Sequence, residues 1–354
     1  MNTKWLEFLA EKGAVVENSQ AVSVEETTSP YYSLDDTYIC ELTKLGLIRA
    51  SGEEAQSFLH GQFTNDLNNV SSELSQLSSY CNHKGRMLSI FRIFKRDNNF
   101  YLTLPREILD TTLKKLTMFK MMAKVDLFDE SDELVQFGIA GPNTESILSS
   151  LHITIPHQVN HCTHSNEITI IRLPSENTRV LFISNTNLAI AFWKQISAKI
   201  SIATSGFWDL HDIHSGIPQV CANTSEAFIP QMTNLELIDG VNFNKGCYPG
   251  QEVVARTHYL GKPNRRMYRA SIADDNAPES GTNIYTPEDA SQPVGKIVIA
   301  QKTSDENCTA LIVLRTEKKD DEALHLGSVA GPKVLVQPLP YSLDSKTDVN
   351  LSQK

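Results

Sequence analysis

The sequence has no closely spaced cysteines. Its six cysteines form no CxxC pair, and the two nearest to each other, Cys221 and Cys247, lie 26 positions apart. Disulfide scaffolds, zinc ribbons and self-contained iron–sulfur motifs use closer or more regular spacing. We therefore expect reduced thiols, no metal site and a cytoplasmic location. The cysteines are Cys40, Cys81, Cys162, Cys221, Cys247 and Cys308.

Long apolar runs and several enzyme motifs are also missing. A membrane-spanning helix needs about 18 apolar residues in succession, and none occurs here. The start, MNTKWLEFLAEKG, carries acids where a secretory signal would be apolar. There is no P-loop, GxGxxG, HExxH or nucleophile elbow, so nothing supports hydrolysis, kinase chemistry or nucleotide redox chemistry. We expect a soluble protein with no membrane partner.

The composition is globular but the charge is unevenly distributed. The 354 residues are 40% hydrophobic and carry a net charge of −10, enough length for about two or three domains. Residues 81–124 nevertheless contain ten lysines and arginines against three acids, and residues 245–269 contain six against one. If these two segments met in the fold, they could bind an anion. Ordinary solvated faces remain the alternative.

The pattern of apolar residues predicts an α+β chain. Two successive sets of strands and helices indicate two lobes over residues 37–266, after a polar, loosely attached leader at 1–36. Within the first set, Gly85 lies between two runs rich in β-formers, which predicts a hairpin. Residues 267–344 show only short strands separated by turns, which indicates a small all-β barrel, and 345–354 form a tail.

The stretch KGCYPGQE holds the candidate of greatest interest, Cys247. Pro249 and Gly250 predict a turn, and a helix can begin at Gln251. A thiol just before a helix N-terminus and two residues from Lys245 would have its thiolate form favoured. A lone cysteine can equally be a small buried apolar residue. Both interpretations stay open on spacing alone.

Two further groups carry weaker signals. WDLHDIH places Trp208 at helical spacing with two histidines; a Trp in this setting is either core or a platform for a flat heterocycle. Glu252 and Arg256, four residues apart, predict a surface ion pair. The histidine-rich stretch from 152 to 164 has no established metal spacing and reads as a loop.

Residues 245–252 carry a family resemblance. KGCYPGQE resembles the signature of the YgfZ family of folate-binding proteins, which are related to the aminomethyltransferase of the glycine cleavage system. The likeness extends over most of the chain, through LGLIRASGEEAQSFLHGQFTND, HKGRMLSIFRIF and FIPQMTNLELIDGVNFNKGCYPGQEVVAR. The signature residues are Lys245, Gly246, Cys247, Tyr248, Gly250, Gln251 and Glu252.

This resemblance implies a fold and a function. It implies a two-lobed folate-binding region and a β-barrel arranged around a central channel. It further implies tetrahydrofolate or a derivative as cofactor. It also implies a role in iron–sulfur protein maturation, which would affect tRNA modification because a tRNA-thiolating enzyme depends on such clusters. Cys247 would be the functional thiol beside Lys245. Folate contacts would come from Trp208, from Tyr248 and from Arg256, whose charge would draw the glutamate tail.

The chain departs from the family pattern at three places. The family's second folate-linked tryptophan falls on Leu45, and His214 stands where relatives often carry a glutamate. The aminomethyltransferase's acidic pair corresponds to Leu88 and Ser89. Without that acid the glycine cleavage reaction lacks a proton-handling group, so we do not expect that enzyme activity.

Three hypotheses follow from these residues. The first is a folate-dependent accessory protein of iron–sulfur maturation. The second is a non-catalytic tRNA-binding module that uses the basic segments and loses affinity steeply with salt. The third is a folate-dependent one-carbon transferase with an unknown acceptor.

Overall fold

The computed structural model describes all residues except 1, 18–19, 25–30, 166, 262 and 344–354. The chain divides into two compact units: residues 1–60, 67–76 and 91–211 form the first, and 61–66, 77–90 and 212–354 form the second. Strand β6 and helix α6 each begin in one unit and end in the other. Helices and strands are mixed throughout the described residues, so the expected α+β class is confirmed.

The first unit is built on a six-stranded sheet with the order β10-β11-β12-β9-β3-β13. All its pairs are antiparallel except β13 with β3. The strands are β3 (Tyr38–Glu41), β9 (Leu134–Ala140), β10 (Cys162–Ser165), β11 (Ile168–Leu173), β12 (Arg179–Asn185) and β13 (Ser201–Ala203).

A five-stranded sheet has the order β5-β6-β7-β4-β8. The sharp turn between β5 and β6 forms the hairpin expected at Gly85, which has a φ of 72°. The strands are β4 (Leu45–Ser51), β5 (Gln76–Cys81), β6 (Met87–Arg96), β7 (Asn99–Pro105) and β8 (Asp126–Asp129), and a separate two-stranded sheet contains β1 (Ala14–Glu17) and β2 (Gln20–Val24).

Helices cover the sheets of the first unit. They are α1 (Thr3–Glu11), α2 (Ala55–His60), η1 (Leu67–Asn69), η2 (Arg106–Ile108), α3 (Leu109–Phe119), α4 (Thr144–Ser150), α5 (Thr186–Ser197) and the start of α6 (Ser205–Ser215). The six-stranded sheet alternates its side chains between two cores. Ile39, Phe137 and Phe182 face one core, with α1 and α5, whereas Cys40 and Leu181 face the other, with Trp208 of α6.

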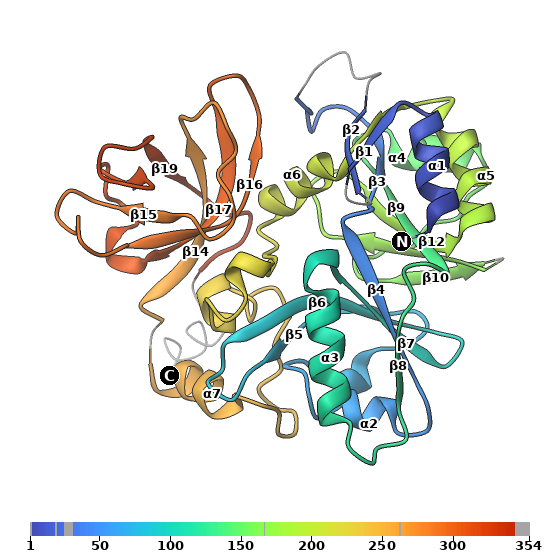
Figure 1. The fold of residues 1–354 in the computed structure, drawn as a ribbon, viewed down its shortest axis with the longest axis horizontal. Coiled ribbons are helices and arrows are strands. Elements are labelled where there is room, and N and C mark those ends of the chain that lie inside the picture. The colour runs from blue at the N-terminus through green and yellow to red at the C-terminus, as the bar shows by residue number, and fades with distance from the viewer. Residues whose placement is uncertain (1, 18–19, 25–30, 166, 262, 344–354) are drawn as a thin grey trace, which may run out of the picture. The chain divides into compact units, whose positions relative to one another are not determined.

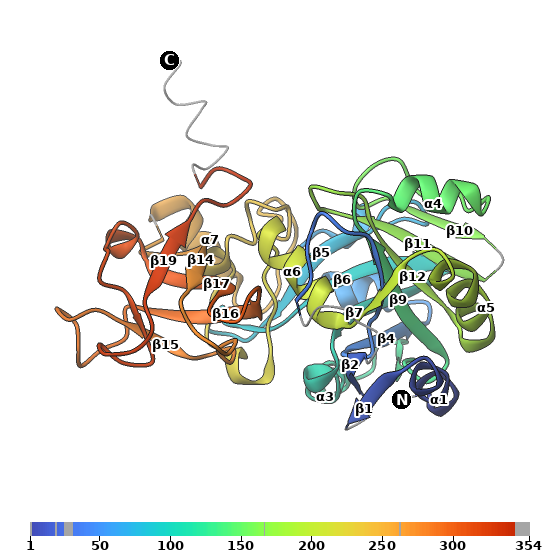
Figure 2. The ribbon, with the colours of Figure 1, turned by 90° about the horizontal axis from the view of Figure 1, so that it is seen from above.

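Helix α1 is attached to the core more firmly than the sequence predicts. The first 36 residues were expected to be loosely attached, but Trp5, Phe8 and Leu9 are buried in the core. Trp5 meets Trp193 of α5 edge to face, with ring centres 5.4 Å apart, and the two helices lie side by side in both views (Figures 1 and 2). Three apolar side chains on one face of a short helix are enough to anchor it.

The second unit ends in a six-stranded antiparallel sheet with the order β18-β15-β16-β17-β14-β19. An isolated bridge between His325 and Lys333 links its two ends, so the sheet curls (Figure 2). The strands are β14 (Arg265–Ile272), β15 (Asn283–Tyr285), β16 (Gly295–Lys302), β17 (Cys308–Arg315), β18 (His325–Leu326) and β19 (Val334–Gln337), and the helices are η3 (Ala222–Thr224), η4 (Pro230–Thr233), α7 (Gln251–Leu260) and η5 (Thr316–Lys318).

Candidate functional site

The KGCYPGQE stretch forms a turn that packs on the β5–β6 hairpin within the second unit. Gly250 precedes the first residue of α7 and has a φ of 80°, a conformation that glycine adopts without strain. A Cβ at Gly250 would overlap the Asn82 carbonyl oxygen and the backbone of Gly85. The sequence prediction of a turn followed by a helix at Gln251 is confirmed, and the two glycines permit the close approach.

Lys245 reaches inward from this turn. Its side chain is buried, its Nζ donates a hydrogen bond of 2.6 Å to the Phe63 carbonyl, and it lies over the Tyr248 ring. Burial lowers the pKa of Lys245 to about 8, partly opposed by Asp66 and Cys247. An amine with this pKa exchanges its proton near neutral pH.

Cys247 points outward from the same turn. It is the one cysteine of the six with an exposed side chain; Cys221 is half-buried and the other four are buried. All six thiols are free, as the spacing predicted. Lys245 lies close enough to Cys247 for the two groups to interact electrostatically. Helix α7 begins four residues after Cys247. The packed-core alternative for Cys247 is therefore wrong, because the thiol is accessible.

Tyr248 fills the space beneath the turn. It is 7% exposed, and burial raises the pKa of its phenol, with a smaller contribution from Cys81. Gly246 and Glu252 are exposed, and Gln251 is half-buried. Tyr248 thus serves as packing for the turn, and its contact with folate stays a prediction.

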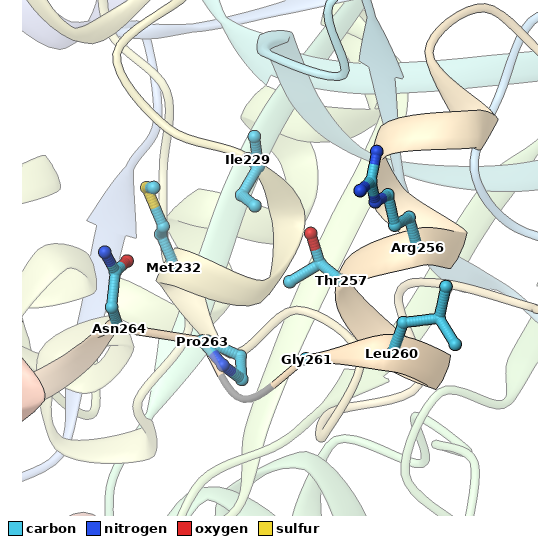
Figure 3. A pocket seen from close by; sticks show the side chains of 8 residues that line it. All are labelled: Ile229, Met232, Arg256, Thr257, Leu260, Gly261, Pro263 and Asn264. Atoms are coloured by element: carbon cyan, nitrogen blue, oxygen red, sulfur yellow. The ribbon is translucent and has the colours of Figure 1, made fainter.

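The surface pair expected between Glu252 and Arg256 does not form among the described residues. Arg256 instead lines a pocket beside η4 with the apolar side chains of Ile229, Met232 and Leu260 (Figure 3). An exposed i,i+4 pair contributes only about 0.5 kcal/mol, so a competing environment readily displaces it. Arg256 therefore remains available to bind an anion.

The start of one basic segment does meet the other within the second unit. Gly85 lies against Val253 of α7, so Lys84 and Arg86 flank this helix. Arg265 has its pKa lowered by burial and by the nearby charges of Arg315 and Arg86. Arg265 is thus close enough to both Arg315 and Arg86 for their charges to repel its own.

Trp208 and Leu45 lie in the first unit. Trp208 is 3% exposed, with the Arg179 guanidinium 3.9 Å from its ring centre, and it occupies the space that a Cβ at Gly138 would fill. Leu45 lines a cavity of about 20 Å³ with Trp5 and Leu42, which is room for about one water. Trp208 is therefore packed within its unit, and the cavity beside Leu45 is too small for a pterin.

Three residues that depart from the family pattern are hydrogen-bonded or buried. His214 accepts a hydrogen bond of 3.1 Å from Arg269 through its Nδ1. Leu88 and Ser89, where the related enzyme has its acids, are both buried in the second unit. The His214 imidazole is therefore engaged by a cation and does not reproduce a free carboxylate.

Sequence reasoning missed a group of residues that fixes α7. Gln231 of η4 donates 2.6 Å to the Val254 carbonyl, and Asn234, at a φ of 58°, exchanges hydrogen bonds with the backbone of Met267. QMTN carries no signal of this, because the partners lie about 20 to 30 residues away and side-chain amides are common in loops.

Known proteins with similar sequences identify the family of this chain. The tRNA-modifying protein YgfZ of Photorhabdus laumondii is 31% identical over 310 residues, spanning 87% of this chain and 93% of that protein. The homologue of the same name from Colwellia psychrerythraea is also 31% identical, over 88% of this chain and 95% of the relative. The chain belongs to the YgfZ family.

The fold matches a second group. Residues 34–191 match the family model of the GCVT N-terminal domain. The crystal structure of the glycine cleavage system aminomethyltransferase T from Bartonella henselae covers 97% of each chain with a TM-score of 0.76 at 12% identity. The family resemblance seen in KGCYPGQE is confirmed, and the YgfZ-family chain shares the fold of that aminomethyltransferase. Among the described residues no helix is long and apolar enough to cross a bilayer.

Proposed function

We propose that this chain is a folate-binding accessory protein of iron–sulfur protein maturation, and that it supports tRNA modification through an iron–sulfur client such as a tRNA-thiolating enzyme. Relatives named tRNA-modifying protein and an aminomethyltransferase-like fold support the general assignment. The observation that carries the proposal is the exposed Cys247 thiol held on a rigid turn beside Lys245.

The turn gives Cys247 the properties of a working thiol. Thiolates, not thiols, bind metals and attack electrophiles. The Lys245 amine can hold or release a proton near neutral pH, and it lies two residues from the thiol. The described residues contain no group of three or more metal-ligating side chains. Cys247 would therefore act on a cluster together with donors from a partner protein.

Folate binding in this proposal rests on family and fold. Of the residues that the resemblance names in the first unit, Trp208 is buried and Leu45 lines a cavity with room for about one water. We therefore assign no chemical step to the folate. We propose only that folate binds to the protein and influences the Cys247 thiol.

Two measurements test the halves of this proposal. Isothermal titration should show saturable binding of tetrahydrofolate to wild type and to Cys247→Ala. In a deletion strain, the Cys247→Ala gene should fail to restore thiolated tRNA nucleosides, whereas Cys221→Ala should restore them. Absence of any tetrahydrofolate binding removes the folate half. Full restoration by Cys247→Ala removes the thiol half.

A second candidate function, direct tRNA binding, is favoured by the position of Arg265 near Arg86 and Arg315, although Arg315 also pairs with Asp289. Mutual repulsion among cations is relieved when they contact phosphates. Fluorescence anisotropy with tRNA should then give a steep loss of affinity with salt, and Arg265→Gln should reduce the slope of log K against log[salt] by about 0.7 to 0.9. Affinity that does not change with salt would eliminate this candidate.

A further inference from the structure

A pocket of about 370 Å³ lies between α7 and η4 in the second unit (Figure 3). This volume is at the lower end of small-molecule sites, which span roughly 300–1,000 Å³. Its lining residues come from three segments: the start of η4, the second half of α7 and the connection to β14. They are Ile229, Met232, Arg256, Thr257, Leu260, Gly261, Pro263 and Asn264.

The walls of this pocket are fixed to one another. Gln231 of η4 donates to the Val254 carbonyl of α7, and Arg266 at the start of β14 donates 2.9 Å to the Gln231 carbonyl. Asn234 adds two hydrogen bonds to the backbone of Met267. All five residues that supply these side-chain and backbone groups are buried. A cavity held this way exists before a ligand arrives, which lowers the entropy cost of binding.

The lining combines apolar surface with unused polar groups. Ile229, Met232 and Pro263 are apolar, and Leu260 is 82% exposed at the edge. Contact with an apolar ligand would remove this leucine surface from water, which is energetically favourable. The lining residues that the structure describes include no carboxylate. Within the part of the chain that the structure describes, the guanidinium of Arg256 has no hydrogen bond or ion pair.

The electrostatics favour a singly charged anionic group beside Arg256. Guanidinium groups bind carboxylates through two parallel hydrogen bonds, and Arg256 is the one cation among the lining residues that the structure describes. The pocket lies along the C-terminal half of α7, where the helix dipole places partial negative charge. A carboxylate, which places one charge on one group, is therefore better accommodated than a phosphate, which places two.

We propose that this pocket binds a small carboxylate with a compact apolar body, the carboxylate on Arg256 and the apolar part against Ile229, Met232 and Leu260. Figure 3 shows Arg256 and Leu260 on the α7 side and Met232 and Asn264 on the opposite side, so a ligand between them contacts both walls. Two sources share this chemistry: a free apolar carboxylic acid, and the aminobenzoyl-glutamate end of a folate. The second source rests on the proposed function, and the first does not.

The test uses the full chain and four probes: phenylacetate, its neutral analogue phenylacetamide, phenyl phosphate and p-aminobenzoyl-glutamate. Two-dimensional NMR should show saturable shift changes for phenylacetate at the amides of 229–232 and 256–264. Arg256→Gln should weaken phenylacetate by about tenfold, which corresponds to about 1.4 kcal/mol. Lys333→Gln, which removes an exposed charge at the C-terminal sheet that does not line the pocket, should leave the affinity unchanged.

The probes separate the two sources and can overturn the proposal. Tighter binding of p-aminobenzoyl-glutamate than of phenylacetate assigns the pocket to a folate tail, and the reverse order assigns it to a free acid. Equal affinity for phenylacetamide, tighter binding of phenyl phosphate, or unchanged phenylacetate affinity in Arg256→Gln would each contradict a carboxylate site. A failure of tetrahydrofolate to bind leaves the phenylacetate result intact and refutes the folate proposal alone.

Discussion

The Nζ of Lys245 lies 5.1 Å from the centre of the Tyr248 ring. This aromatic contact and the hydrogen bond to Phe63 hold a buried amine two residues from the exposed thiol of Cys247. Cations over aromatic faces are stabilised even when partly desolvated. Burial nevertheless dominates and sets the proton affinity of Lys245.

We expect Lys245 to titrate near pH 8, about the value that its burial gives. NMR of the lysine side chains should reveal one pKa well below the ordinary 10.5, and Lys245→Met should remove that signal. Because the folded protein binds fewer protons than the unfolded chain between these values, the free energy of unfolding should rise with pH from 8 to 10.5 relative to Lys245→Met. A Lys245 pKa of 10 or above would contradict this account.

Alkylation should distinguish Cys247 from the other thiols. Burial raises the pKa of Cys81 to about 12 and of Cys162 to about 11, and raises that of Cys40. At pH 7.5 iodoacetamide should therefore modify Cys247 first, because reaction requires an accessible thiolate. Peptide mass spectrometry should find one early adduct, and Cys247→Ala should lack it. A first adduct at Cys221 instead would show that the turn does not expose Cys247 as described.

Gly250→Ala should destabilise the second unit. The methyl group would meet the Asn82 carbonyl and Gly85 at a φ of 80°, so strain and overlap together should lower the unfolding free energy by at least about 2 kcal/mol. The matched control is Gly261→Ala, where φ is −145° and the nearest atom is 3.7 Å away. It should change stability by less than about 0.5 kcal/mol. Urea denaturation measures both; equal losses would refute the role of the close approach.

Arg179→Met should reveal the stacking on Trp208. The Arg179 side chain is fully buried, lies over the indole and donates 3.3 Å to the Trp208 carbonyl. Its loss should lower the unfolding free energy by about 2–4 kcal/mol. Lys124→Met is the control, because Lys124 and Glu53 form an ion pair in which both side chains are exposed, and its loss should cost under about 1 kcal/mol. If Arg179→Met lowered the unfolding free energy as little as the control does, the Trp208 indole would not need the cation for its stability.

The local features of this fold followed from local sequence. Gly85 between two β-rich runs predicted the hairpin, and Pro249-Gly250 predicted the turn before α7, because turns and helix starts depend on residues a few positions apart. The ordered motifs around KGCYPGQE also identified the family that the comparisons confirmed.

Tertiary structure decided what long-range packing controls. The sequence determined that Cys247 follows Lys245 at a turn; the fold decided that the amine is buried and the thiol exposed. It likewise placed Trp208 against Gly138, 70 positions away. Composition cannot fix such outcomes, because burial depends on which distant segment covers a residue, and the helix α1 packs into the core for the same reason.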